Sequence, residues 1–140
     1  MLFRSPVKIG GAHGGVSVGA DGATHQSLEE ISLMAILPNM HLEVPCDAVE
    51  TERATVHALL RVPGPSYVRF AREATPVVTT IQTPYVFGKA NVIRFRGERP
   101  SFIDAFEQVL AAEYKSEQED ASIIACGRSE ERRVGKECRL

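Results

Sequence analysis

The stretch from residue 40 to residue 70 reads MHLEVPCDAVETERATVHALLRVPGPSYVRF. Apolar and polar residues alternate over residues 40–44, which predicts a strand with one more polar face, on which His41 would be exposed. An Asp-x-x-Glu spacing opens residues 47–60, whose apolar residues continue until the breaker at residues 63–65. Residues 67–70 are again β-prone. The stretch therefore predicts a strand, a helix and a second strand.

The sequence upstream of this stretch adds one more strand and one more helix. Val7 to Gly10 is a short apolar run that ends in glycines, which is typical of a buried strand leading into a loop. After the loop, Ser27 and Glu30 have the spacing of a capping box, and apolar residues recur at helical spacing up to Leu37. Strands that alternate with helices in this order predict an α/β fold with a parallel sheet and flanking helices. The apolar stripes of the two helices are expected to lie in the core.

The sequence downstream of residue 74 has a weaker pattern. The β-prone pieces 77–81 and 91–95 are separated by Pro and Gly, which is typical of a segment that crosses the surface. Apolar residues recur at helical spacing over residues 101–110 and predict an amphipathic helix. The apolar run at residues 123–125 predicts the first strand of a further domain.

The two ends of the chain differ from the rest. Residues 128–138 resemble the translation of a sequencing-library adapter, and residues 2–5 resemble the adapter of the opposite end, so both are left out of the fold. Residues 6–127 then carry 10 Lys and Arg against 15 Asp and Glu, a net charge of −5. Their basic residues are scattered rather than clustered, which argues against nucleic acid as a partner.

Hydropathy and cysteine usage favour a cytoplasmic protein. No apolar run approaches the roughly 20 residues that a membrane span requires, and the start lacks the pattern of a signal peptide, so no membrane partner is expected. Cys46, Cys126 and Cys138 lie too far apart for a metal site or a paired disulfide framework. We therefore expect reduced, structural thiols.

Residues 13–26, here called the glycine loop, carry a specific motif. They read HGGVSVGADGATHQ, which is similar to the transketolase signature, commonly HDSIGxGEDGPTHQ. The likeness continues in the family's order through residues 37–39, 44–51 and 70–72. The chain thus resembles the thiamine-diphosphate-dependent transketolases, and in particular the C-terminal section of split transketolases. The resemblance implies an incomplete, Rossmann-like pyrimidine-binding domain.

The resemblance also divides the chain. Residues 6–80 would form the partial pyrimidine-binding domain, residues 81–120 a linker with one helix, and residues 121–127 the start of a truncated C-terminal domain. Residues 1–5 and 128–140 would be the adapter-like ends.

The function that the resemblance implies is transfer of a two-carbon ketol unit from a ketose phosphate to an aldose phosphate. By the family pattern, His25 would be catalytic and would contact the cofactor. Asp21 would accept a hydrogen bond from a substrate hydroxyl, while His13 and Arg72 would hold the substrate phosphate. Arg69, three residues before Arg72, would point to the opposite face of an extended strand and is left aside.

The cofactor implied by the resemblance is thiamine diphosphate with a divalent metal, Mg or Ca, bound mainly by a domain absent from this chain. The Glu that activates the cofactor in the family also has no counterpart here. The implied partners are sugar phosphates, an N-terminal diphosphate-binding domain or subunit, and further copies in a homo-oligomer. We expect the full-length protein to be an enzyme and this fragment alone to be inactive.

Four departures from the signature bear on specificity. Gly14 and Gly15 stand where the signature has Asp and Ser, and Ala20 and Ala23 stand where it has Glu and Pro. Two of these differences, at Gly14 and Ala20, remove a carboxylate.

The alternatives are a 1-deoxyxylulose-5-phosphate synthase or another thiamine-diphosphate enzyme, and a noncatalytic relative of the fold. Residues 26–29, Gln-Ser-Leu-Glu, follow Thr-His as they do in transketolases, which favours transketolase over the synthase. The β subunits of 2-oxo acid dehydrogenases generally lack the Asp-Gly-x-Thr-His-Gln pattern. A Glu in the upstream sequence would separate an enzyme from a noncatalytic relative.

Overall fold

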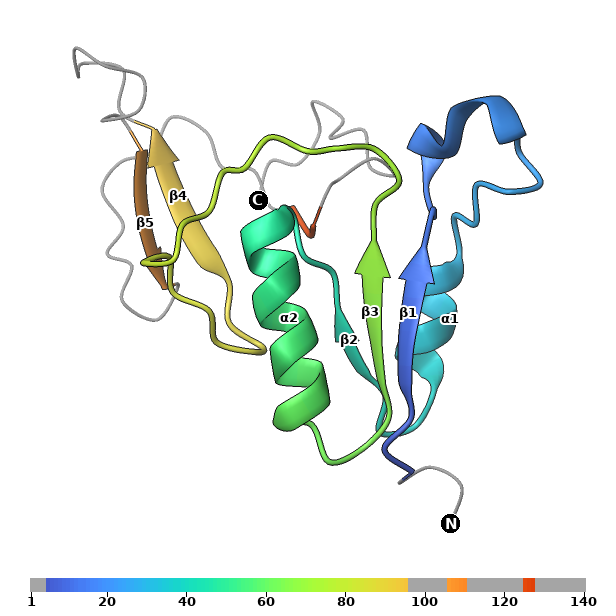
Figure 1. Ribbon diagram of the computed structural model, residues 1–140, viewed down its shortest axis with the longest axis horizontal. Helices are drawn as coiled ribbons and strands as arrows, with labels where there is room; N and C mark the ends of the chain where they lie inside the picture. Colours follow the sequence, from blue (N-terminus) through green and yellow to red (C-terminus); the bar gives the residue numbers. More distant parts are fainter. Residues whose placement is uncertain (1–4, 96–105, 111–124, 128–140) are drawn as a thin grey trace, which may run out of the picture. The chain divides into compact units, whose positions relative to one another are not determined.

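The computed structural model of the chain describes residues 5–95, 106–110 and 125–127. The elements run in the order β1 (Lys8–Ala12), the 3-10 helix η2 (Val16–Asp21), α1 (Glu30–Ile36), β2 (His41–Glu43), α2 (Ala48–Leu60), β3 (Ser66–Phe70), β4 (Asn91–Phe95) and β5 (Phe106–Leu110) (Figure 1). The chain divides between Val78 and Thr79 into two compact units.

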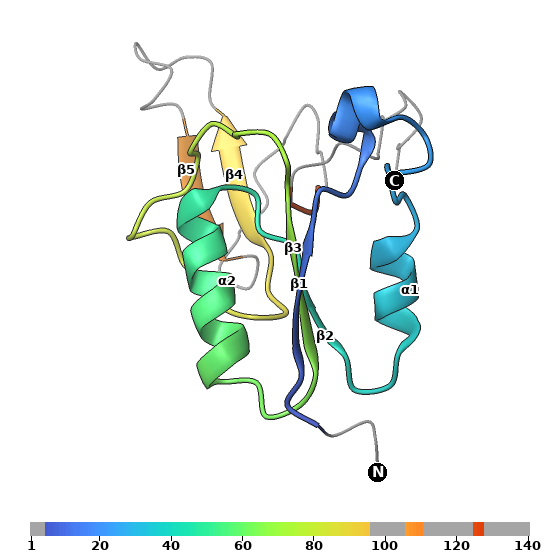
Figure 2. The ribbon, with the colours of Figure 1, turned by 45° about the vertical axis from the view of Figure 1, so that its right-hand side comes forward.

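The first unit is built on a three-stranded parallel sheet in the order β1, β3, β2. All five residues of β3 pair with β1, from Lys8 opposite Ser66 to Ala12 opposite Phe70. Figure 2 shows the sheet nearly edge-on, with α1 on one face and α2 on the other. Crossovers through helices on both faces are the expected way to join parallel strands. The predicted α/β fold with flanking helices is confirmed.

The start of α2 is fixed by Asp47, as the sequence predicts. Oδ1 of Asp47 accepts a hydrogen bond from the backbone N–H of Glu50 at 2.9 Å, and Oε2 of Glu50 accepts one from the backbone N–H of Cys46 at 2.7 Å. Oδ2 of Asp47 accepts a third hydrogen bond, from the backbone N–H of Val78 at 2.8 Å. The buried carboxylate thus caps α2 and ties the segment after β3 to the helix start.

Helix α1 begins later than the sequence predicts, and the expected capping box is wrong. Ser27 has a φ of 45°, the N-cap position is Glu29, and no side chain caps the helix. The carboxylate of Glu30 does not turn back toward the helix start, because it receives a hydrogen bond from Nε of Arg69 on β3 at 2.5 Å. A contact between distant parts of the chain replaces the local cap.

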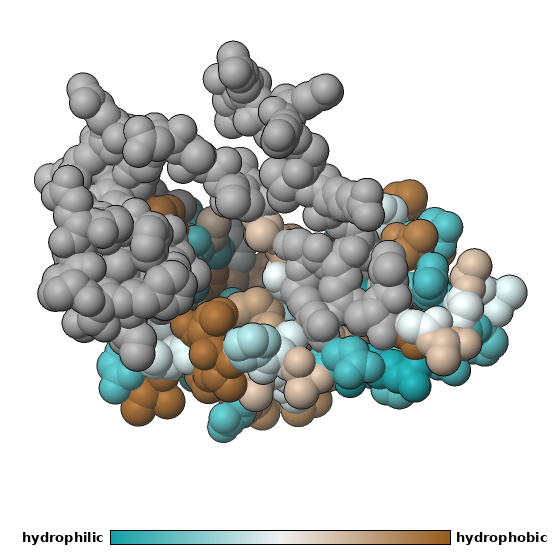
Figure 3. Space-filling view, turned by 90° about the horizontal axis from the view of Figure 1, so that it is seen from above, coloured by the Kyte–Doolittle hydropathy of each residue, from teal (hydrophilic) through white to brown (hydrophobic). Residues whose placement is uncertain are grey.

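The core of the first unit is small. Its buried apolar side chains are Val18, Ala54, Ala58, Val62, Tyr67 and Val68. The expectation that the apolar stripes of both helices lie in the core is wrong for the large residues, because Leu33 is 60%, Ile36 is 77% and Leu60 is 75% exposed. Helix α1 buries none of its residues. Apolar side chains accordingly reach the surface between polar ones, as the space-filling view of Figure 3 illustrates for one face.

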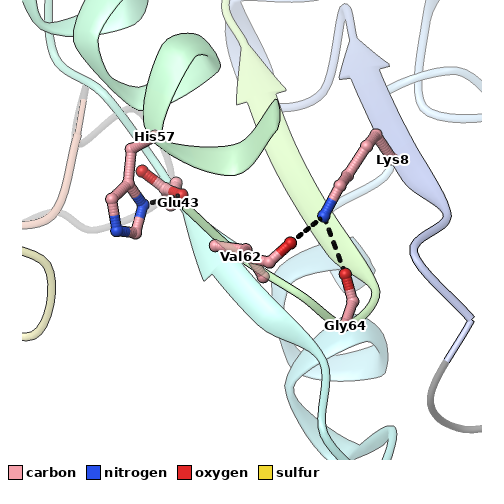
Figure 4. Close-up of polar contacts among 5 residues, drawn as sticks. All are labelled: Lys8, Glu43, His57, Val62 and Gly64. Atoms are coloured by element: carbon pink, nitrogen blue, oxygen red, sulfur yellow. Dashed lines mark hydrogen bonds and ion pairs between the residues drawn. The ribbon is translucent and has the colours of Figure 1, made fainter. Parts of the chain in front are cut away.

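Strand β2 carries a buried polar pair where an exposed polar face was expected. Glu43 is 4% exposed, and its Oε1 lies 2.9 Å from Nδ1 of His57 on α2 (Figure 4). His41, on the same strand, is half-buried. The expectation is wrong at Glu43 because α2 covers this face of the sheet, and a parallel sheet is covered on both faces.

The turn from α2 to β3 is held by β1. Nζ of Lys8 donates hydrogen bonds to the carbonyl oxygens of Val62 and Gly64, at 2.7 and 2.8 Å (Figure 4). These carbonyls lie on either side of Pro63, within the sequence that was predicted to end the helix. Lys8 therefore satisfies two backbone acceptors where the helix ladder stops.

The second unit, among its described residues, contains one antiparallel strand pair. β4 and β5 pair from Asn91 opposite Leu110 to Phe95 opposite Phe106. The helix expected over residues 101–110 is therefore wrong at residues 106–110, where ladder hydrogen bonds to β4 take the place of helical ones. Apolar spacing over so short a window is compatible with either structure. The β-prone piece 91–95 is confirmed as a strand, and residues 77–81 form none.

Some expectations concern residues that the structure does not describe. These are most of the adapter-like ends, at residues 1–4 and 128–140, the beginning of the expected helix at residues 101–105, and residues 123–124 of the expected further strand. Among the helices of residues 5–95, none is both long and apolar enough to cross a membrane.

Candidate functional site

The expected site residues lie at one edge of the parallel sheet, where β1 and β3 end. Ala12 is opposite Phe70 in the register, so the chain leaves both strands at the same level. His13 follows β1 directly, and its backbone N–H donates to the carbonyl oxygen of Phe70 at 3.2 Å. Arg72 lies two residues beyond β3. The carboxyl edge of parallel strands is where α/β folds bind ligands.

The glycine loop closes on itself above this edge. The backbone N–H of Gly15 donates to the carbonyl oxygen of Gln26 at 2.5 Å, which joins its two ends. Gly15, Gly19 and Gly22 have φ angles of 94°, 68° and 76°, values that favour glycine over any residue with a Cβ. The backbone N–H of His25 donates to the Gly22 carbonyl oxygen at 3.1 Å. The glycines therefore allow a tight loop that contains η2.

Arg72 fastens the glycine loop to the end of β3. Its Nη1 donates to the carbonyl oxygen of Val18 at 2.5 Å and to Oδ2 of Asp21 at 2.6 Å. Val18 is buried, whereas the side chains of Arg72 and Asp21 are 35% and 49% exposed. The structure thus brings together two of the four expected site residues, and leaves both accessible from solvent.

The two expected histidines belong to the same loop and are both exposed. His13 has a φ of 63°, an unusual value for a residue with a side chain. Nδ1 of His25 lies 2.9 Å from the hydroxyl of Thr24. The structure therefore joins Asp21 to Arg72 directly, and it places the two imidazoles on the loop that carries Asp21.

Arg69 and Glu30 form an ion pair that the sequence did not predict. The side chain of Arg69 is 3% exposed and that of Glu30 is 12% exposed. Arg69 does leave β3 away from Arg72, as expected, but this face is covered by α1 rather than by solvent. A charged residue in a strand flanked by helices on both sides was the available signal, because buried charges in proteins are paired.

The thiol of Cys46 is unsuited to nucleophilic chemistry. Burial raises the pKa of Cys46 to about 12, and the hydrogen bond to Glu50 and the charges of Glu50 and Asp47 add to this rise. A thiol with so high a pKa is protonated at neutral pH. This supports the expectation of a structural thiol.

Metal ligands are not grouped in the part of the chain that the structure describes. No set of three or more His, Cys, Asp or Glu side chains there could hold a metal ion. The chemistry that the carboxyl edge offers is therefore that of one guanidinium, one carboxylate and two imidazoles.

Comparison with known proteins extends this picture. A sequence family described as Transketolase, pyrimidine binding domain, matches residues 2–78, a range that contains the whole parallel sheet and the four expected site residues. One of the two subunits of an apulose-4-phosphate transketolase, from Phocaeicola vulgatus, is 46% identical over 91 residues, which are 64% of this chain and 29% of that protein. The 1-deoxy-D-xylulose-5-phosphate synthase of Shewanella sp. is 33% identical over 125 residues, which are 88% of this chain and 20% of that protein.

A solved structure gives a similar result for the fold. It is described as a split gene transketolase, inactive beta4 tetramer, and it matches with a TM-score of 0.51 and 34% sequence identity. The match covers 62% of this chain and 26% of that one. The chain thus spans less than a third of each of these proteins.

Proposed function

Since this chain belongs to the transketolase pyrimidine-binding domain family, we propose that it forms the substrate-facing part of a transferase that moves a two-carbon ketol unit from a ketose phosphate to an aldose phosphate. The observation that carries the proposal is the pairing of Arg72 with Asp21 beside a closed loop that holds two exposed imidazoles. These groups can bind a phosphate, orient a hydroxyl and move a proton.

Arg72 is the phosphate anchor in this proposal. Its guanidinium is permanently charged, is fixed to the carbonyl oxygen of Val18, and remains 35% exposed. A guanidinium can offer two parallel N–H donors to a phosphate, which gives direction as well as charge. His13, at the same carboxyl edge, is the second phosphate ligand. Asp21 accepts a hydrogen bond from a sugar hydroxyl.

His25 is the residue to which we assign proton transfer. It lies exposed on the glycine loop, and its Nδ1 contacts the Thr24 hydroxyl, which leaves Nε2 to face a ligand. An imidazole donates and accepts protons near neutral pH with little cost. His25 would give and take the proton of a reacting sugar oxygen, and would lie against the cofactor.

The cofactor of this proposal is thiamine diphosphate. When bound, it supplies the carbon nucleophile and the electron sink that ketol transfer needs. The residues of this chain fit one wall of such a site, because exposed imidazoles line the loop while the described residues offer no cluster for the metal. We therefore assign the diphosphate and its divalent metal, Mg or Ca, to an N-terminal domain or a separate subunit.

Association with other subunits follows from the same reasoning. The relative from Phocaeicola vulgatus is one subunit of a transketolase, and the similar solved structure is a β4 tetramer of a split transketolase. Helices α1 and α2 expose large apolar side chains that a monomer leaves in water. We propose a homo-oligomeric enzyme that is active only together with the diphosphate-binding domain or subunit.

A second candidate is a 1-deoxyxylulose-5-phosphate synthase. The match to the Shewanella synthase extends over 88% of this chain, a larger share than the 64% in the match to the Phocaeicola transketolase. The two reactions share the cofactor and a sugar phosphate acceptor, and they differ in the donor. The donor substrate is therefore the property to measure.

The test uses the full-length protein assembled with its diphosphate-binding partner. We expect ketol transfer from xylulose phosphate to ribose phosphate and none from pyruvate to glyceraldehyde phosphate. His25→Ala should lower kcat by at least about 100-fold, the usual contribution of a general acid or base. Arg61→Ala, at an exposed position after α2, is the control and should keep full activity. Reaction of pyruvate alone would favour the synthase, and no turnover of either donor would favour a noncatalytic relative.

A further inference from the structure

Gly14 leaves space that the carboxylate of Glu30 occupies. Gly14 is buried, and the three atoms nearest to a Cβ placed on it are the two carboxylate oxygens and Cδ of Glu30. All three lie too close for a real Cβ, so the loop and the helix compete for the same volume. A side chain at position 14 and the present position of Glu30 exclude one another.

The carboxylate of Glu30 cannot move aside at low cost. Nε of Arg69 donates to its Oε1 at 2.5 Å, and the two side chains are 3% and 12% exposed. Moving Glu30 would take its charge away from a buried guanidinium, which is far more costly than moving a free side-chain end. Arg69 itself is fixed on β3, the central strand of the sheet.

Position 14 is also where the chain departs from the transketolase signature, which has Asp there. We infer that Glu30 supplies, from α1, the carboxylate that the glycine loop lacks at Gly14, and that its pair with Arg69 positions the beginning of the loop. The site beneath the loop accepts one carboxylate, which comes either from the loop or from the helix. Glu30 is thus a positioning residue and not a catalytic one.

The position of this pair explains what it would control. Gly14 lies between His13, at the end of β1, and Gly15, whose backbone N–H closes the loop on the Gln26 carbonyl oxygen. The Glu30 carboxylate packs against the Gly14 backbone from the α1 side. Loss of the pair should therefore loosen the loop closure and the backbone that carries His13, while the Asp21 contact to Arg72 is left unchanged.

The inference is tested by moving the carboxylate back. In the complete 140-residue chain, Gly14→Asp alone should lower Tm by roughly 10 °C or more, because two carboxylates would share one buried volume. Glu30→Ala alone should lower it by a similar amount. The double variant Gly14→Asp/Glu30→Ala should regain more than half of either loss. Glu29→Ala, the exposed neighbour, is the matched control and should change Tm little.

An uncharged isostere separates charge from volume. Gly14→Asn/Glu30→Ala fills the same space without a carboxylate and should remain at least about 5 °C below the Asp double variant. Limited proteolysis and hydrogen exchange at the Gly15 amide report loop closure even where melting is not cooperative. Protection by both measures should be weakened in the single variants and restored in the Asp double variant.

Two results would overturn the inference. Additive losses in Gly14→Asp/Glu30→Ala would mean that the two positions do not share one carboxylate site. Equal Tm and equal Gly15 protection for the Asp and Asn double variants would mean that only volume matters at this position. Neither result depends on enzyme activity, so the inference can fail while the proposed function stands, and the reverse.

Discussion

Helices α1 and α2 cover opposite faces of the same sheet, but different interactions hold them there. Helix α2 has its own start signal, with Asp47 and Glu50 bonding backbone N–H groups within four residues, and it buries Ala54 and Ala58. Helix α1 has no side-chain cap and buries none of its residues. It is joined to the sheet through Glu30 and Arg69. One helix is specified locally, and the other depends on a contact between residues 39 positions apart.

The difference matters because α1 follows the glycine loop directly, while α2 is remote from it in sequence. The loop that carries His13, Asp21 and His25 is thus joined to the less independent helix. Changes in the Glu30 to Arg69 pair should reach the candidate site, and changes at the α2 cap should affect the fold without altering the site first.

The largest expected effect comes from removing the guanidinium of Arg69. Arg69→Met leaves the carboxylate of Glu30 without its ion-pair partner in a site that is nearly closed to water. We expect a loss of roughly 3–5 kcal/mol in the free energy of unfolding. Urea denaturation followed by circular dichroism measures it, with Arg61→Met as the control at an exposed position. A loss below about 1 kcal/mol would mean that α1 does not depend on this pair.

The next effect is that of the α2 cap. Asp47→Ala removes the cap on Glu50 and also the acceptor for the backbone N–H of Val78. The cap contributes about 1 kcal/mol and an unpaired backbone N–H costs about 1–2 kcal/mol, so we expect a loss of roughly 2–3 kcal/mol. Asp47→Asn keeps both acceptors only in part and should fall between. A larger loss for Asp47→Ala than for Arg69→Met would reverse the comparison between the helices.

The thiol of Cys46, one residue before the α2 cap, gives a smaller effect that depends on pH. Burial, followed by Glu50, raises its pKa from 9.0 to about 12 in the folded chain. Between these values the unfolded chain loses the proton first, so the contribution of Cys46 to stability is present below pH 9 and is lost as the pH rises toward 12.

Alkylation measures the same shift. With Cys138→Ser as background, iodoacetamide at about pH 8 should modify the exposed Cys126 at least about 10-fold faster than Cys46 in the folded chain, because the thiolate is the reacting form. Equal rates in the folded chain would show that the start of α2 is open to solvent. Equal rates in urea are the control.

The smallest expected effect is at the outer faces of the helices. Ile36 and Leu60 are 77% and 75% exposed, so Ile36→Lys and Leu60→Lys should change the unfolding free energy of the chain by less than about 0.5 kcal/mol. Denaturation of the chain alone tests this, with solubility as a second readout. A loss of about 2 kcal/mol for either would show that the face is covered in the isolated chain.

The sequence predicted what depends on neighbouring residues. The α2 cap follows from the Asp47 to Glu50 spacing, and the parallel order follows from strands that alternate with helices. Glu30 and Glu43 could not be placed, because each carboxylate is bound by a residue from another element, Arg69 or His57. Pairing with β4 likewise decides the structure at Phe106 to Leu110, where the apolar spacing suits a helix as well as a strand.

The candidate site was predictable as a set of residues and less so as a geometry. The resemblance to transketolases named His13, Asp21, His25 and Arg72, and their roles stay predictions. Their order along the chain does not reveal that Arg72 bonds Asp21 directly, since 51 positions separate the two. That contact depends on the register of β1 and β3, which brings the ends of both strands to one edge.

The most direct test of the account is the phosphate preference of an Arg72→Met variant in the complete enzyme. We compare kcat/KM for xylulose phosphate and for xylulose, which lacks the phosphate. If Arg72 holds the phosphate, the variant should lose at least about 30-fold with the phosphorylated ketose and little with the free sugar. Equal losses with both sugars would contradict a phosphate site at this edge of the sheet.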